Sequence, residues 1–286
     1  MRRSAQIVGV AIAVLLCVAG IVWGALLRNS SHFLTVSFLN VGQGDAIFIE
    51  TPHGRQVLID GGPNSGVLRQ LSSVMPWYDR SIDVVIPTHP DADHIGGLID
   101  VLERYTVGMI VQSSVQGTTP LSDALERIIV DKKKQGTQRI EAQRGQIIDL
   151  GDGAYIEVFF PDRSVPNIET NTGCVVTKLI YGDTSFMLPC DAPAAIEKYL
   201  VSLDGKSLQA DVLKAGHHGS KTSSSIAFVG FVDPEYAVYS RGCKNSYGHP
   251  HENTIATFKD FGVTTLDTCT HGTITFVSDG QKVNLK

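Results

Sequence analysis

IPTHPDADHIGG, residues 86–97, is the stretch of this sequence that decides its fold. It contains four polar side chains of the kinds that bind metal ions: His89, Asp91, Asp93 and His94. The apolar run DVVIP before them predicts a short buried strand, and IGGLIDVLERY after them predicts a helix. Alternate positions of an extended loop point to one side, so the first three side chains can converge, while His94 points back over the same pocket from the start of the helix.

Two interpretations of this loop follow from the residues alone. Two imidazoles and two carboxylates are suitable ligands for a divalent metal, and burying four uncompensated polar groups beside an apolar strand would otherwise be costly. Alternatively, the loop is solvated and Asp91 or Asp93 caps the following helix. We favour the metal site as a hypothesis that the rest of the sequence has to support.

The segments around this loop predict two similar halves. In the first half, apolar or alternating runs predict strands at 34–40, 45–51, 55–60, 83–87, 107–111 and 155–160, and helices within 65–75, from about 94 and at about 121–134. In the second half, strands are predicted at 174–182, 184–190, 211–215, 236–240 and 272–278, and helices at about 193–201, 222–230 and 252–260. This order predicts one α/β domain over residues 33–286, with two sheets inside and helices outside.

The N-terminus predicts a membrane segment. The run from Ile7 to Leu27 is almost continuously apolar, and as a helix it would span roughly 32 Å, against about 30 Å for the hydrocarbon core of a bilayer. Arg2 and Arg3 favour an inside N-terminus, which predicts a single-pass anchor over residues 1–31 and an extracytoplasmic domain at the cell membrane. The alternative is a cleaved signal peptide and a secreted protein, although the apolar region of a signal peptide is usually shorter.

Composition and charge narrow the function classes. Of the 286 residues, 43% are hydrophobic and 19% are charged, which excludes intrinsic disorder for the bulk of the chain. The formal net charge is −5, and without residues 1–31 the 21 remaining basic residues face 29 acidic ones, a net charge of −8. The domain therefore lacks the positive charge typical of nucleic-acid-binding proteins, and any polyanion has to be held by a local site or by metal.

The five cysteines do not decide the redox compartment. Cys174 and Cys190 lie in apolar, strand-like segments, which predicts buried thiols. Cys243 and Cys269 could form a disulfide in an oxidising compartment, although spacing alone does not establish the pairing.

Six blocks of the sequence together resemble one family. They are FLNVGQGDAIFIE (38–50), LIDGG (58–62), THPDADHIGG (88–97), DVLKAGHHGSKTSSS (211–225), NSYGHPH (245–251) and GTITFVSDG (272–280). The combination resembles the metallo-β-lactamase-fold hydrolases, and more specifically the C-terminal metallo-β-lactamase-like domain of competence protein ComEC and its stand-alone relatives. The resemblance covers nearly all of the predicted domain and implies a four-layer αββα sandwich with one or two divalent metal ions at the sheet edge.

The resemblance also implies roles for individual residues. The implied metal ligands are His89, Asp91, Asp93, His94, Asp191 and His218. Asp191 matches the carboxylate that bridges two metals, and His218 is the late ligand in preference to His217. Asp60 matches a carboxylate that lies behind the ligands and orients their loop. His249 is a ligand or a contact to the substrate phosphate. The expected catalytic residues are Asp93, Asp191 and His249.

Further residues are expected to contact the substrate. They are His217, Ser220, Lys221 and Asn171. Ser220 and Lys221 precede a predicted helix, where hydroxyls and an ammonium favour an anion, and ordinary capping of that helix is the compatible alternative. The turn VGQGD (41–45) is placed by the resemblance at the mouth of the site, so Asp45 or Gln43 is a candidate lining residue.

The sequence departs from the wider superfamily at two positions. Many members carry another His ligand between the first loop and the bridging Asp, whereas residues 95–216 contain no His and Asn171 stands where the ComEC-like group tends to have Asn. The first metal position is therefore ligand-poor. At the position before the bridging Asp, this chain has Cys190 in place of the usual Gly. A buried thiol at this position would be inert, whereas an accessible one could bind metal or oxidise.

The implied chemistry is hydrolysis. A carboxylate is a harder ligand than an imidazole, so Asp91 in place of a His gives the first metal position a harder ligand set, which suits Mn²⁺ or Zn²⁺. Two cations about 3.5–4 Å apart can bridge a hydroxide and hold a phosphodiester. The expected mechanism is in-line attack on phosphorus by a hydroxide held by Asp191, with His249 and the backbone amides near Gly219 stabilising the developing charge.

The leading hypothesis is a membrane-anchored, extracytoplasmic metal-dependent phosphodiesterase or nuclease, with a phosphodiester such as DNA as its substrate and no protein partner implied. One apolar segment does not form the many-helix channel of a DNA importer, so a free-standing nuclease and a cell-wall phosphodiesterase acting on phosphorylcholine esters both fit. A lactonase or β-lactamase is a second class, although such enzymes generally use a first site richer in His. A metal-binding module without catalysis is the third.

Overall fold

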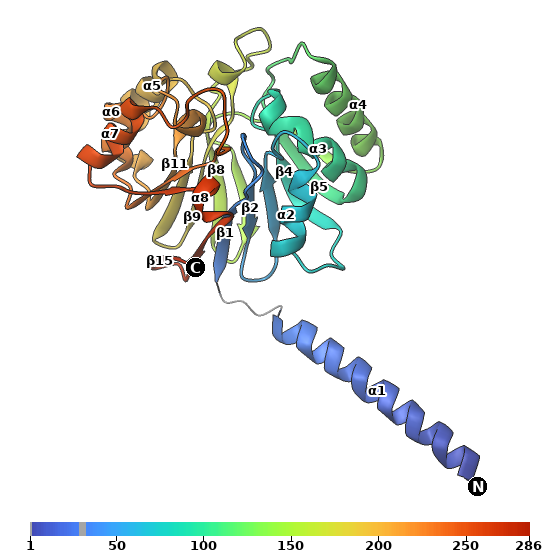
Figure 1. The fold of residues 1–286 in the computed structure, drawn as a ribbon. Helices are drawn as coiled ribbons and strands as arrows, with labels where there is room; N and C mark the ends of the chain where they lie inside the picture. The colour runs from blue at the N-terminus through green and yellow to red at the C-terminus, as the bar shows by residue number, and fades with distance from the viewer. Residues whose placement is uncertain (1, 29–32) are drawn as a thin grey trace.

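Two β-sheets packed face to face form the centre of the structure, a computed structural model that describes residues 2–28 and 33–286 (Figure 1). The first sheet has eight strands in the order β15 (Val283–Leu285), β14 (Ile274–Ser278), β1 (Leu34–Phe38), β2 (Ile47–Glu50), β3 (Gln56–Ile59), β4 (Ser81–Ile86), β5 (Thr106–Gln112) and β6 (Gln138–Glu141). The second has seven in the order β13 (Thr264–Asp267), β12 (Tyr236–Tyr239), β11 (Val212–Lys214), β10 (Thr184–Leu188), β9 (Val176–Tyr181), β8 (Ala154–Phe160) and β7 (Ile147–Gly151).

Helices cover the outer face of each sheet (Figure 1). The first sheet is covered by α2 (Gly66–Val74), α3 (Ala92–Arg104) and α4 (Pro120–Lys134). The second is covered by α5 (Ala194–Asp204), α6 (Ile226–Val232) and α7 (Glu252–Asp260). The remaining short elements are α8 (Thr268–His271) and the 3₁₀ turns η1 (Asn171–Gly173), η2 (Gly205–Leu208) and η3 (Gly216–Gly219). The predicted αββα arrangement is therefore confirmed.

Alternation along the strands explains why these layers pack. In β3, Val57 and Ile59 point into the core between the two sheets, whereas Leu58 points to the opposite face and packs under α2 and α3. The two sheets meet through aromatic side chains, with Phe276 of β14 at 6.1 Å, centroid to centroid, from Phe186 of β10. All of these side chains are buried. Each sheet therefore carries apolar side chains on both of its faces, one face against the other sheet and one against the helices.

The parallel strand pairs decide where the polar loops meet. Ile59 of β3 is paired in parallel with Ile86 of β4, and Phe186 of β10 is paired in parallel with Val212 of β11. Each pair therefore ends at the same edge of its sheet, and the loops that follow lie together there. The strands β6, β7, β13 and β15, which the sequence did not predict, lie at or next to the outer ends of the sheets.

The N-terminal segment forms helix α1 (Arg2–Arg28), and its described side chains are exposed, as for Leu16 at 68%. Judged by length and hydropathy together, no helix among the described residues qualifies as a membrane span. The predicted transmembrane anchor therefore stays a prediction. The end of the predicted anchor, residues 29–31, lies outside the described residues.

The cysteine prediction is partly wrong. Cys174 and Cys190, expected to be thiols, are joined by a disulfide, while Cys243 and Cys269 form the pair that was considered. Spacing did not suggest the first pair, because its partners come together only when η1 packs beside the end of β10.

Candidate metal centre

Asp191 lies at the centre of the candidate site. It follows β10 after a turn in which Cys190 has the left-handed backbone angle φ 48°, and its side chain is only 3% exposed. Its Oδ2 atom is 3.3 Å from His94 Nε2 and 3.3 Å from His218 Nε2, while Oδ1 accepts a 3.0 Å hydrogen bond from Lys214 Nζ. Despite its burial, the neighbouring His218, Lys214 and His94 hold the pKa of this carboxyl well below its usual range.

The loop before α3 and the first turn of that helix carry four of the candidate ligands predicted from the sequence. Asp91 is the N-cap residue of α3 in backbone position, yet its carboxylate makes no capping hydrogen bond within the described chain and lies 3.7 Å from His89 Nε2. Asp93 Oδ2 lies 3.3 Å from His218 Nε2. The capping alternative for Asp91 is therefore not supported, and both carboxylates face imidazoles. The rings of His89 and His94 are 4.0 Å apart, centroid to centroid.

Asp60 orients two of the imidazoles at once. It is completely buried and accepts hydrogen bonds from Thr88 N at 2.8 Å, from Thr88 Oγ1 at 2.7 Å and from His94 Nδ1 at 2.8 Å. Because the Thr88 hydroxyl donates to Asp60, its oxygen accepts from His89 Nδ1, which lies 2.9 Å away. Both Nδ1 atoms are thereby donors. The Nε2 atoms of His89 and His94 are turned toward the space beside Asp191.

His218 is oriented from the opposite sheet. Its Nδ1 donates to the carbonyl oxygen of Ser240 at 2.8 Å, so its Nε2 faces Asp93 and Asp191. The turn η3 that carries it is unusual, because both His217 (φ 48°) and His218 (φ 56°) have left-handed backbone angles. His218 is 1% exposed, whereas the His217 side chain is 29% exposed and lies 3.6 Å from Asp191 Oδ2. The preference for His218 as the inner residue agrees with this geometry.

The site has the ligand atoms of a divalent metal centre. His89 Nε2 and His218 Nε2 are buried and have no hydrogen-bond partner among residues 2–28 and 33–286. Two overlapping groups bring their ligand atoms within 4.8 Å of one another: His89 with His94 and Asp191, and Asp93 with His94 and His218. Burial, followed by the neighbouring His94, lowers the pKa of His89, which keeps this imidazole neutral as a metal ligand must be. The residues present therefore fit one or two divalent metal ions.

A buried ion pair supports the site and was not found from the sequence. Lys214 of β11 is 1% exposed, and its Nζ contacts Asp45 Oδ2 at 2.5 Å, Asp191 Oδ1 at 3.0 Å and the carbonyl oxygen of Cys190 at 2.9 Å. Although burial opposes it, Asp191 and Asp45 raise the pKa of this ammonium. Asp45 was a candidate lining residue, and the structure places it behind the ligands instead. The available signal was the single charged residue in the otherwise apolar segment VLKA (212–215).

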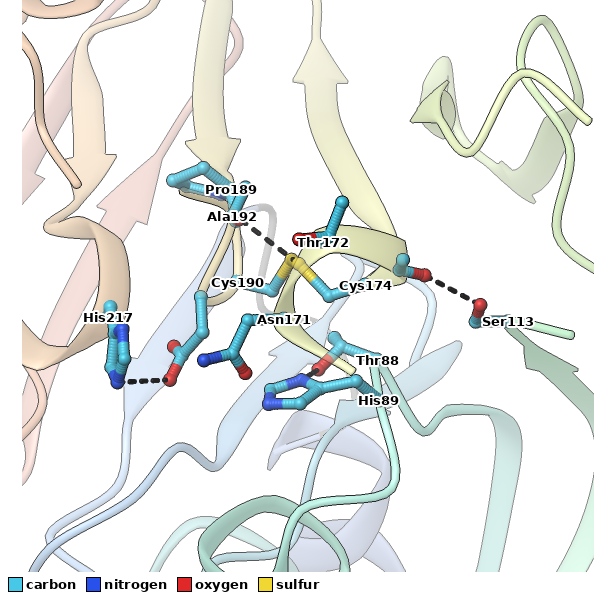
Figure 2. The surroundings of a disulfide bond; sticks show 12 residues. Thr88, His89, Ser113, Asn171, Thr172, Cys174, Pro189, Cys190, Ala192 and His217 are labelled. Atoms are coloured by element: carbon cyan, nitrogen blue, oxygen red, sulfur yellow. Dashed lines mark hydrogen bonds and ion pairs between the residues drawn. A yellow bond between two sulfur atoms is a disulfide. The ribbon is translucent and has the colours of Figure 1, made fainter. Parts of the chain in front are cut away.

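The other predicted residues lie at the edge of the site. His249 is 7% exposed, and its ring centroid is 5.6 Å from that of His217 and 6.3 Å from that of His218. Burial, followed by His218 and the other histidines, lowers the pKa of His249 to about 4. Asn171 lies in η1, with a buried side-chain oxygen that has no hydrogen-bond partner in the described structure. Figure 2 shows Asn171 near His89 and the Cys174–Cys190 disulfide.

Ser220 and Lys221 follow η3. Ser220 is buried, and its hydroxyl lies 2.9 Å from that of Thr222, whereas Lys221 is exposed. Neither of them caps α6, because that helix begins only at Ile226 and Ser225 accepts the hydrogen bond from its first turn. The predicted start of this helix, near residue 222, was therefore too early.

The Asp60→Asn substitution tests the orienting network. Asn tolerates the left-handed backbone angle at this position (φ 58°), so the main chain is expected to be preserved. The Asn amide group would place two N–H donors against Thr88 or His94, whose own groups also donate at this position. Because two donors cannot bond to each other, the tautomers of the histidines are disturbed. We expect metal affinity to fall about 10–100-fold, measured by competition with a chromophoric chelator. Unchanged affinity would show that Asp60 does not orient the ligands.

The sequence is similar to one described protein family and to several known proteins. Residues 39–242 match the family described as the metallo-beta-lactamase superfamily. The chain is 28% identical over 263 residues to "ComE operon protein 3" of Bacillus subtilis, covering 84% of this chain and 32% of that protein. It is 29% identical over 245 residues to "Competence protein ComA" of Neisseria gonorrhoeae, covering 84% and 32%. The chain thus spans about a third of the length of these relatives.

Solved structures with the same fold are more distant in sequence. CmlA, a diiron beta-hydroxylase from Streptomyces venezuelae, matches with a TM-score of 0.56 and 14% identity, covering 85% of this chain and 53% of that one. Igni18, a metallo hydrolase from the archaeon Ignicoccus hospitalis, matches with a TM-score of 0.54 and 16% identity, covering 85% and 98%. At these identities the likeness shows the fold alone.

Proposed function

The chain belongs to the metallo-beta-lactamase superfamily, and from this premise we propose that it is a metal-dependent phosphodiesterase that acts on DNA. The observation that carries the proposal is the convergence of imidazoles from both sheets on one oxygen, Asp191 Oδ2. His89 Nε2, which has no hydrogen-bond partner among the described residues, lies around the same point with the carboxylates of Asp91 and Asp93. Such a mixed set of nitrogen and oxygen ligands suits Zn²⁺ or Mn²⁺.

The chain's own residues would divide the work as follows. A divalent metal held here supplies Lewis-acid activation of a phosphoryl oxygen and lowers the pKa of a water. Asp191 holds the ligand groups of both sheets together through Oδ2. His249 has a pKa of about 4 and is neutral at neutral pH, so it can donate a hydrogen bond to a phosphoryl oxygen from the edge of the site. Buried Ser220 and exposed Lys221 flank the same edge and can contact a phosphate.

One argument favours DNA among phosphodiesters, and a second favours phosphodiesters in general. The relative from Neisseria gonorrhoeae is named "Competence protein ComA", and another from Haemophilus influenzae, 29% identical over 226 residues, is named "Recombination protein 2". Competence and recombination are both processes in which DNA is handled. In addition, carboxylate ligands of the Asp91 type favour hard metal ions of the kind that phosphoryl-transfer enzymes use.

A cavity beside the metal centre favours a second candidate, a small phosphodiester with a cationic alcohol such as choline. The cavity has a volume of about 550 Å³ and is lined by His89. Its lining also includes three carboxylates, from Asp123, Glu126 and Glu141, and the single guanidinium of Arg139. Arg139 is already paired with Glu126 at 2.7 Å, so the cavity would attract a cation and repel a long polyanion.

The test compares substrates on one preparation of the full chain, purified in detergent without chelator. Hydrolysis of bis-(p-nitrophenyl) phosphate, p-nitrophenyl phosphorylcholine, single- and double-stranded DNA, a lactone and a chromogenic β-lactam is measured with Mn²⁺ or Zn²⁺. We expect metal-dependent cleavage of the simple diester and of DNA, abolished by EDTA. Cleavage of the choline ester with intact DNA would support the second candidate. Activity on the lactone or β-lactam alone, or on none, would overturn the proposal.

We also propose that residues 7–27 anchor the protein in the cell membrane with the domain outside the cytoplasm. The proposal is supported by the uninterrupted apolar sequence and by Arg2 and Arg3 before it. Protease added to intact spheroplasts is expected to digest the domain and leave a short membrane-bound fragment. A domain that is digested only after lysis would contradict the orientation, and a soluble domain lacking residues 1–31 would indicate a cleaved signal peptide.

A further inference from the structure

The Cys174–Cys190 disulfide joins two segments of the candidate metal centre (Figure 2). Cys190 directly precedes Asp191, and Cys174 directly follows η1, which carries Asn171. Both cysteines are buried, at 3% and 0% exposure. The other disulfide, Cys243–Cys269, includes a more exposed position and is attached neither to the Asp191 turn nor to the His89 loop, so the chain contains an internal comparison.

On one side the bridge is attached to the turn that precedes Asp191. Cys190 has φ 48°, a conformation in which glycine is preferred and other residues are held only by their surroundings. Its carbonyl oxygen accepts hydrogen bonds from Lys214 Nζ at 2.9 Å and from the backbone N of His217 at 3.1 Å. The turn at Cys190 is thus connected to the segment that carries His217 and His218.

The Cys174 side of the bridge is attached to the first ligand loop. The backbone N of Val175 donates to the carbonyl oxygen of Thr88 at 3.0 Å, next to His89. The carbonyl oxygen of Gly173 accepts from the Ser113 hydroxyl at 2.6 Å. The segment that contains Cys174 is therefore hydrogen-bonded to the loop that carries His89.

We propose that the Cys174–Cys190 disulfide is a positioning clamp for the metal centre. It couples the Asp191 turn, which belongs to the second sheet, to the His89 loop, which belongs to the first, across the short segment that carries Asn171. The bridge replaces the conformational freedom of glycine at position 190 with a covalent constraint, and so keeps Asp191 Oδ2 at its distance from the histidines of both sheets. The inference rests on one part of the proposed function, namely that the site holds metal.

The test measures metal binding to the folded protein and does not depend on a substrate. The full chain in detergent is compared with Cys174→Ala/Cys190→Ala, with Cys174→Ala/Cys190→Gly and with the control Cys243→Ser/Cys269→Ser. Zn²⁺ and Mn²⁺ affinities are measured by chelator competition, and the electron paramagnetic resonance spectrum of the Mn²⁺ protein reports whether two ions are coupled. We expect both variants of the clamp to bind metal 10–100-fold more weakly and to lose any coupling, and the control to stay within twofold.

The glycine variant separates the clamp from the backbone conformation. Glycine accepts φ 48° without strain, so this variant is the one expected to fold if the alanine variant does not. If the glycine variant binds metal as the parent does, the clamp is overturned, because backbone conformation alone would then position Asp191. Thermal unfolding is measured in parallel, and lower stability with unchanged affinity in the folded state would equally overturn the clamp. A parent that binds no metal would overturn the proposed function, and the clamp with it.

Discussion

Asp191→Asn is expected to weaken binding of divalent metal at least a hundredfold and to abolish metal-dependent hydrolysis. Asp191 Oδ2 lies 3.3 Å from the Nε2 atoms of both His94 and His218, and no other described carboxylate oxygen is shared in this way. Asparagine has nearly the same shape but no negative charge. Removing one partner from a buried charged group costs about 3–5 kcal/mol, which corresponds to roughly a hundredfold or more in affinity.

The measurement is metal content after dialysis, followed by chelator competition and initial rates on the substrate that the parent cleaves. Asp183→Asn is the matched control, because Asp183 is an exposed aspartate in the turn before β10, at the end of that strand remote from Asp191. The control is expected to bind and hydrolyse as the parent does. Parent-like metal content and rate in Asp191→Asn would contradict the placement of the metal centre.

Lys214→Met is expected to lower the free energy of unfolding of the metal-free protein by about 3–5 kcal/mol. The substitution removes the one ammonium that contacts both Asp45 and Asp191, at 2.5 Å and 3.0 Å, and leaves two buried carboxylates without it. Methionine has a similar length, so lost packing contributes little. Both carboxylates owe part of their low pKa to Lys214, so their charges lose a stabilising partner at neutral pH.

A double-mutant cycle separates this pair from general damage. Lys214→Met/Asp45→Asn removes both charges together, and we expect it to be less destabilised than the sum of the two single variants. Saturating Zn²⁺ is expected to restore part of the stability of Lys214→Met, because a ligand that binds only the folded state stabilises it. Lys134→Met, in the last turn of α4, is the control and should change stability by less than about 1 kcal/mol, since its pair with Asp131 is exposed on the surface. The free energy of unfolding of each variant is measured by urea unfolding. If the losses of the two single variants simply add in the double variant, the ion pair is contradicted.

The regular elements were largely predictable because their patterns are local. The alternation in β1, the apolar run in β3 and the apolar spacing of α3 are each visible within a few residues, and the structure has these elements within a few positions of the predicted ranges. The strands that were missed, such as β6 with the sequence QRIE, are short and partly exposed at the sheet ends, so they lack a hydrophobic period. The start of α6 was predicted too early, because Ser223 and Ser224 precede the actual cap, Ser225.

By itself, the sequence determined the two-sheet architecture and the ligand loop, since His89, Asp91, Asp93 and His94 lie within six residues and their proximity needs no tertiary contact. Only the tertiary structure decided that Thr88 connects His89 to Asp60, that Lys214 joins Asp45 to Asp191, and that Cys174 pairs with Cys190. These groups are distant along the chain, apart from Thr88 and His89, and carry no local period. They meet because the carboxyl ends of strands from two sheets are brought to one edge by strand pairing and by the apolar core between the sheets.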